Sequence, residues 1–156
     1  MPDPGNKLFS VLLVDDSLDD RLFFKNSLRA TSRLRLLAEI EDGQVALDYF
    51  EGRGQFADRE RFPLPDLLVL DLKMPRVNGF DVLDWLRTRE FNHLTVVLTD
   101  SMQPEDTKRA LDLGADLFQV KPVNENGRRA MALALERRLI EIELRHQPAT
   151  PENRHG

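Results

Sequence analysis

Two short apolar runs in the chain end in aspartates. Residues 11–14 read Val-Leu-Leu-Val and are followed by Asp15 and Asp16. Residues 67–70 read Leu-Leu-Val-Leu and are followed by Asp71. Apolar runs without polar alternation are typical of strands covered on both faces of a parallel sheet. Because such sheets bind ligands beyond the carboxyl ends of their strands, we expect the three carboxylates to share one site.

Two further apolar runs end in groups of another kind. Residues 95–98 lead to Thr99, and residues 117–120 lead to Lys121 and Pro122. The strand ends therefore carry, in order, an acid pair, an acid, a hydroxyl and an amine. This set suits phosphoryl transfer to an aspartate, which needs a nucleophilic carboxylate, a divalent cation, and positive or hydrogen-bonding groups opposite the cation.

A cation is expected at the three carboxylates because they would otherwise repel one another. At about 5 Å and an effective dielectric constant near 20, each like-charged pair costs roughly 3 kcal/mol. Mg²⁺ relieves this repulsion and prefers oxygen ligands from one or two carboxylates, water and phosphate. Asp15, Asp16 and Asp71 can supply such ligands.

The order of these residues resembles the receiver domain of two-component response regulators, over about residues 7–146. The resemblance implies that Asp71 is the phosphoacceptor. It also implies that Asp16 and Asp71 bind Mg²⁺ directly and that Asp15 binds it through water. The backbone carbonyl of Lys73 would be a further ligand.

The same resemblance assigns roles to the later strand ends. Lys121 would contact a phosphoryl oxygen, and the hydroxyl of Thr99 would donate a hydrogen bond to it. Phe118 matches the family's aromatic switch, whose rotamer follows the hydroxyl. The family has a cis peptide bond between the lysine and Pro122, and X-Pro bonds can be cis at modest cost. The sequence itself leaves this isomer open.

Strands and helices are expected to alternate along the chain. The predicted strands are 8–14, 34–40, 67–70, 95–98 and 117–120. The predicted helices are 19–32, 43–50, 80–89, 104–113 and 125–145. Five β/α repeats predict an α/β fold with a doubly wound parallel sheet, and the resemblance implies the flavodoxin-like strand order 2-1-3-4-5. Three side chains of the first helix are expected to face the sheet: Leu22, Phe23 and Leu28.

One receiver domain is expected over residues 7–146, with flexible ends at 1–6 and 147–156. The polar segment 51–65 is longer than a usual helix-to-strand connection of two to six residues, which predicts a functional or mobile loop.

The last predicted helix carries two sets of apolar residues. The first set has helical spacing and is expected to face the sheet: Met131, Leu135, Leu139 and Ile142. The second set cannot all face the same way: Leu133, Ile140 and Leu144. We interpret the second set as a hypothesis of homodimerisation through this helix.

Residues 46–50, 51–65 and 65–72 are similar to stand-alone receivers that partner phytochrome-type sensor kinases. This similarity implies that the protein accepts phosphate from a sensor histidine kinase or a histidine phosphotransfer protein. The signal would pass to a partner or a second copy through the surface of helix four, strand five and helix five. The resemblance implies no enzyme beyond the gain and loss of the chain's own phosphoryl group.

Size and composition exclude several other classes of protein. The chain has 156 residues, which is a one-domain length, and its formal net charge is −5. Nucleic-acid binding is not expected, because it normally requires a basic face. The absence of cysteine excludes disulfides and thiolate catalysis. No signal peptide and no apolar run near the roughly 20 residues of a membrane span is seen, so a cytoplasmic protein is expected.

Two departures from the family pattern leave phosphoryl lifetime open. Asp100, beside Thr99, adds a carboxylate where the family usually has a small residue, and Lys73 adds a cation two residues after Asp71. The alternatives are a phosphorylation-independent module of the same fold, an aspartate-nucleophile phosphatase and a flavodoxin-like cofactor binder. The phosphatase would carry an aspartate where Lys73 stands, and no phosphate-cradling loop follows Val14.

Overall fold

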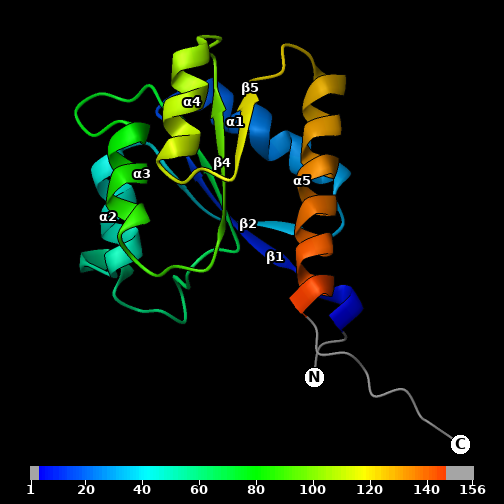
Figure 1. Cartoon of the computed structure of the whole chain (residues 1–156). Helices are drawn as coiled ribbons and strands as arrows, with labels where there is room; N and C mark the ends of the chain where they lie inside the picture. Colours follow the sequence, from blue (N-terminus) through cyan, green and yellow to red (C-terminus); the bar gives the residue numbers. More distant parts are fainter. Residues whose placement is uncertain (1–3, 147–156) are drawn as a thin grey trace, which may run out of the picture.

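The computed structural model describes residues 4–146. Its centre is a parallel sheet of five strands in the order β2-β1-β3-β4-β5 (Figure 1). The strands are β1 (Phe9–Val14), β2 (Leu34–Ile40), β3 (Leu67–Leu70), β4 (Leu94–Thr99) and β5 (Leu117–Val120). The predicted doubly wound architecture and its strand order are confirmed.

Helices cover both faces of the sheet. They are α1 (Leu18–Ser27), α2 (Gly43–Glu51), α3 (Gly79–Arg87), α4 (Pro104–Asp112) and α5 (Glu125–His146). The helices α1 and α5 pack together on one face, and α2, α3 and α4 cover the other (Figure 1). Of the ends predicted to be flexible, residues 4–6 form a short 3₁₀ helix, and residues 1–3 and 147–156 lie outside the described residues.

The central strand β1 shows how both faces of the sheet are filled. Val11 and Leu13 pack with side chains of α1 and α5, whereas Leu12 and Val14 pack with side chains of α2, α3 and α4. All four are at most 2% exposed. Burial of each contributes roughly 1.5 to 3 kcal/mol, which explains an apolar run without alternation. A strand packed in this way holds its carboxyl end rigidly beside its neighbours.

The face of α1 that packs on the sheet differs from the prediction. Of the three side chains expected to face the sheet, Leu28 is partly buried and packs against the core on this face, as predicted. Leu22 and Phe23 are instead 45% and 44% exposed. Phe24 is buried in their place. Arg21 is also buried, because its guanidinium donates to the backbone carbonyl of Asp15 at 2.8 Å. A charged residue is therefore buried on this face of α1, and the spacing of apolar residues in the sequence does not predict it.

The apolar residues of α5 pack as predicted for the first set, whereas the second set is partly packed and partly exposed. The first set packs on the sheet face shared with α1: Met131, Leu135, Leu139 and Ile142. Of the second set, Ile140 also packs against this core. Leu133 and Leu144 are exposed, at 38% and 60%. Dimerisation through α5 stays a prediction.

The long segment 51–65 is anchored to the end of α2. The guanidinium of Arg59 donates to the carbonyls of Tyr49, Phe50 and Phe62 at 2.7, 2.6 and 3.2 Å. The ring of Tyr49 also contacts that of Phe62, with centroids 6.2 Å apart. These contacts hold part of the segment against the C-terminal end of α2.

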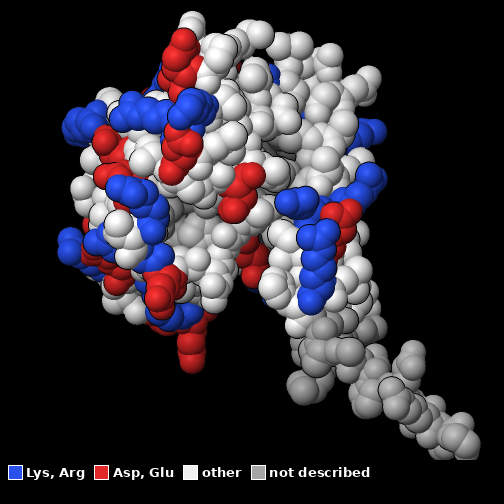
Figure 2. Space-filling model, in the orientation of Figure 1, with Lys and Arg blue, Asp and Glu red and all other residues white. Residues whose placement is uncertain are grey.

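The molecular surface is mixed in charge on the face that Figure 2 shows, where basic and acidic side chains are interspersed over α2 and α3. Among residues 4–146, no helix combines the length and the apolar character needed to cross a membrane.

Candidate functional site

The carboxyl ends of β1 and β3 bring three carboxylates together. Asp15 and Asp71 are 3% and 5% exposed, and Asp16 is exposed. One oxygen from each carboxylate lies within 4.8 Å of the others. The backbone N–H of Asp71 donates to the carbonyl of Val14 at 2.9 Å, which continues the parallel ladder past both strands and fixes this approach. The predicted acidic cluster is therefore formed.

Lys121 lies over this cluster. Its Nζ is 2.8 Å from the carboxylate of Asp15, 2.6 Å from that of Asp20 and 3.8 Å from that of Asp71. The side chain is only 10% exposed. The backbone N–H of Lys121 donates to the carbonyl of Thr99 at 2.8 Å, so the pairing of β4 with β5 positions the lysine.

Asp20 is the residue of this site that sequence reasoning missed. It lies in the first turn of α1, and its backbone N–H donates to the hydroxyl of Ser17 at 3.2 Å. The spacing of Ser17 and Asp20 was the available signal, but it is also the ordinary pattern of a helix start. Only the fold shows that this carboxylate faces a lysine 101 residues away.

The other predicted residues lie in β4, in β5 or in the loops that follow β3 and β4. Thr99 is fully buried at the end of β4, and its hydroxyl oxygen accepts a backbone N–H from two residues later at 3.3 Å. Phe118 is half-buried and packs against the core on the α2–α4 side. Lys73 and Asp100 are exposed. The backbone N–H of Lys73 hydrogen-bonds to Asp71.

The peptide bond between Lys121 and Pro122 is trans, which differs from the isomer that the family resemblance implies. Residues 4–146 contain no cis peptide bond. The trans isomer of an X-Pro bond is the more stable by about 0.5 to 1 kcal/mol. The lysine is aimed here by its ion pairs with Asp15 and Asp20.

Burial dominates the electrostatics of the cluster. It raises the pKa of Asp71 to about 6, an effect that Lys121 opposes and that Asp15 and Asp16 reinforce. Burial also raises the pKa of Asp15, despite hydrogen bonds from Lys121 and a backbone N–H. For Lys121, burial acts to lower the pKa, but the carboxylates around it outweigh this effect and raise it.

The raised pKa of Asp71 predicts that Asp71→Asn stabilises the protein in Mg²⁺-free buffer. A carboxylate whose pKa is higher in the folded than in the unfolded state costs stability as pH rises through the interval between the two values, here from 3.8 to about 6. At pH 7.5 the substitution should raise the free energy of unfolding by about 2 to 3 kcal/mol, and at pH 4.5 by much less. Urea unfolding at both pH values measures this difference, with the exposed Asp100→Asn as control. An equal gain in the free energy of unfolding at both pH values would contradict the raised pKa of Asp71.

The residues present fit a hard divalent cation. The cluster offers carboxylate oxygens only, and such oxygens are the ligands that Mg²⁺ prefers. The raised pKa values of Asp15 and Asp71 mean that one ammonium does not compensate the buried negative charge. The three carboxylates could therefore hold a divalent metal ion.

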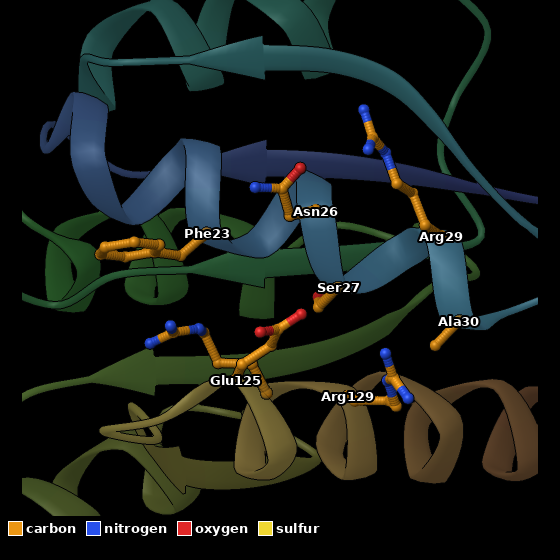
Figure 3. Close-up of a pocket in the computed structure, with 8 residues that line it drawn as sticks. Phe23, Asn26, Ser27, Arg29, Ala30, Glu125 and Arg129 are labelled. Atoms are coloured by element: carbon orange, nitrogen blue, oxygen red, sulfur yellow. The ribbon is translucent and has the colours of Figure 1, made fainter.

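A separate hollow of about 460 Å³ lies between α1 and α5. Figure 3 shows that Phe23, Asn26 and Ser27 from α1 face it, together with Glu125 and Arg129 from α5. The carboxylates of the cluster do not line this hollow. The positive charge of its arginines is offset in part by the negative charge of Glu125. The clustered carboxylates and Lys121 lie at the strand ends instead.

Known proteins share the fold and the sequence pattern of this chain. The family model described as response regulator receiver domain matches residues 11–132. The protein-glutamate methylesterase/protein-glutamine glutaminase 1 of Methanospirillum hungatei is 35% identical over 119 residues, which are 74% of this chain. The chain spans only 31% of the length of that relative.

Two solved structures are similar over most of the chain. The response regulator RPA3017 in red light signaling of R. palustris is 32% identical, with a TM-score of 0.75, over 82% of this chain and 91% of that one. The bacteriophytochrome response regulator RtBRR is 33% identical, with a TM-score of 0.68, over 81% of this chain and 76% of that one.

Proposed function

Because this chain belongs to the family of response regulator receiver domains, we propose that Asp71 accepts a phosphoryl group from a phosphohistidine. The donor is a sensor histidine kinase or a histidine phosphotransfer protein. The observation that supports this most is the convergence of Asp15, Asp16 and Asp71 within 4.8 Å, beneath the ammonium of Lys121.

The transfer step is a displacement at phosphorus. A carboxylate oxygen of Asp71 forms the new O–P bond while the N–P bond of the phosphohistidine breaks, and the released imidazole nitrogen keeps the electron pair and takes up a proton. With a pKa of about 6, Asp71 is mostly ionised at neutral pH and can attack. Lys121 offers positive charge opposite the carboxylates.

The acidic cluster holds Mg²⁺ in this proposal. Asp16 and Asp71 would hold it directly, Asp15 would hold it through water, and the backbone carbonyl of Lys73 would be a further ligand. When bound, Mg²⁺ neutralises the phosphoryl oxygens and so lowers the repulsion that the attacking carboxylate meets.

The signal leaves the site through the end of β4 and through β5. A phosphoryl group adds nearly two negative charges, which bias an existing two-state element rather than build a new one. The buried hydroxyl of Thr99 turns toward the phosphoryl oxygens, and Phe118 follows it. The surface of α4, β5 and α5 then binds a partner or a second copy, with the exposed Leu133 and Leu144 as candidate contacts on α5.

A protein donor suits the surface around the site. Three large apolar side chains shortly after the ends of β1, β4 and β5 are exposed: Leu18, the first residue of α1, at 58%, and the loop residues Met102 at 81% and Val123 at 94%. Exposed apolar groups gathered at one edge are typical of a protein contact. The likeness to RPA3017 and RtBRR favours a kinase of the phytochrome type as this donor.

The proposal is tested by the intact mass of the purified protein after incubation with acetyl phosphate, with and without Mg²⁺. One phosphoryl group per chain, formed only with Mg²⁺, is the expected result. Absence of an adduct under these conditions, together with absence of Mg²⁺ binding, would favour a phosphorylation-independent interaction module of the same fold.

A further inference from the structure

The ion pair between Lys121 and Asp20 has no part in the proposed function so far. It is shorter than the contact with the proposed phosphoacceptor: Nζ lies 2.6 Å from Asp20 and 3.8 Å from Asp71. The side chains of Lys121 and Asp20 are 10% and 29% exposed, so solvent screens the pair only in part. Charge-assisted hydrogen bonds of this length are stronger than ordinary surface ion pairs. The lysine is therefore held mainly by carboxylates other than Asp71.

The start of α1 explains why Asp20 faces the lysine. Asp20 occupies the third helical position after the N-cap Ser17, where an acid usually accepts the N–H of the N-cap residue. Asp81 does this for Asn78 at the start of α3, at 3.0 Å. In α1 the N–H of Ser17 donates to Asp15 instead, at 2.9 Å. The carboxylate of Asp20 is thereby released from its local partner and turns to Lys121.

The lysine also has room to change partners. A cavity of about 30 Å³ is lined in part by Asp15, Asp20 and Lys121. This volume is enough for about one water molecule. An ammonium that moves away from Asp20 would thus leave a carboxylate that water can solvate.

We propose that Asp20 is a positioning residue that restrains Lys121 and so weakens the hold of the site on a phosphoryl group. This inference rests on the proposed function of Asp71. A phosphoryl group on Asp71 needs the ammonium that Asp20 binds at 2.6 Å. The free energy of that contact opposes the phosphorylated state and biases the protein toward its unphosphorylated form.

The test is the affinity for beryllofluoride, which occupies the place of a phosphoryl group on an aspartate, at saturating Mg²⁺. Asp20→Asn should bind it about tenfold more tightly than the unmodified protein, and Asp20→Glu should restore most of the weaker affinity. Asp19→Asn is the matched control, because Asp19 is exposed on the same helical turn and carries the same charge. It should change the affinity by less than about twofold.

A double-mutant cycle shows whether Asp20 acts through the lysine. In a Lys121→Gln background, Asp20→Asn should change the affinity by only about twofold, since the restraint is already gone. An equal gain in both backgrounds, or no gain over Asp19→Asn, would overturn the inference and leave the proposed function standing. Failure of the unmodified protein to bind beryllofluoride, with Mg²⁺ bound, would overturn both. Thermal unfolding of each variant confirms that it is folded.

Discussion

Asp71→Asn is expected to lose phosphoryl incorporation from any donor, by more than about a hundredfold. An amide lacks the anionic oxygen that attacks phosphorus, and the substitution also removes one of the three carboxylates of the acidic cluster. The substitution keeps the size of the side chain and should stabilise the fold, so misfolding would not account for the loss. Intact-mass measurement after incubation with acetyl phosphate and Mg²⁺ gives the stoichiometry directly.

Asp100→Asn provides the matched control for this loss. It removes the same charge from the neighbouring loop, and Asp100 is exposed. We expect this variant to take up one phosphoryl group and to differ only in how long the group survives. Undiminished incorporation in Asp71→Asn would show that a residue other than Asp71, such as Asp15, Asp16 or Asp20, is the acceptor.

Lys121→Met should lower the free energy of unfolding by about 2 to 4 kcal/mol at pH 7.5 in Mg²⁺-free buffer. The ammonium is the partner of the buried carboxylate of Asp15 and contacts Asp71 at 3.8 Å. Its removal leaves these acids without a nearby cation, and their pKa values, already raised by burial, should rise further. Because the folded state would then bind more protons than the unfolded state, the deficit should shrink as pH falls toward 5.

Mg²⁺ should restore part of the stability that Lys121→Met loses, because it supplies the missing positive charge. Urea unfolding with and without Mg²⁺ at pH 7.5 and pH 5 tests this account. Lys108→Met is the control, since Lys108 pairs with Asp112 on the exposed surface of α4, and we expect no measurable change in stability. A deficit that is independent of both pH and Mg²⁺ would indicate lost packing rather than lost charge.

The sheet and much of the candidate site could be predicted from the sequence, because parallel topology places strand ends at one edge. Val14 and Leu70 end buried strands, so the aspartates that follow them were expected at one edge of the sheet, and the pairing of β1 with β3 brings them together. The strand order came from the family resemblance, since β/α alternation alone does not fix it. The same resemblance implied a cis bond before Pro122, which the structure has as trans.

What the sequence could not show depends on contacts between distant residues. Arg21 is buried because its guanidinium donates a hydrogen bond to a backbone carbonyl. A periodic pattern of apolar residues gives no sign of such a hydrogen bond. Asp20 faces Lys121 because Ser17 has already given its N–H to Asp15. Both features depend on which acceptor a single N–H donor reaches in the folded protein, and the types of the residues do not determine that acceptor.

The residue that carries the phosphoryl group can be located by reduction of the acyl phosphate with borohydride, followed by peptide mass spectrometry. Reduction converts the acceptor aspartate to homoserine. Homoserine is expected at position 71 alone, formed only when Mg²⁺ and a phosphodonor are both present. Homoserine at position 15, 16 or 20, or its absence from a protein that carries the phosphoryl mass, would contradict the assignment of Asp71 as the acceptor.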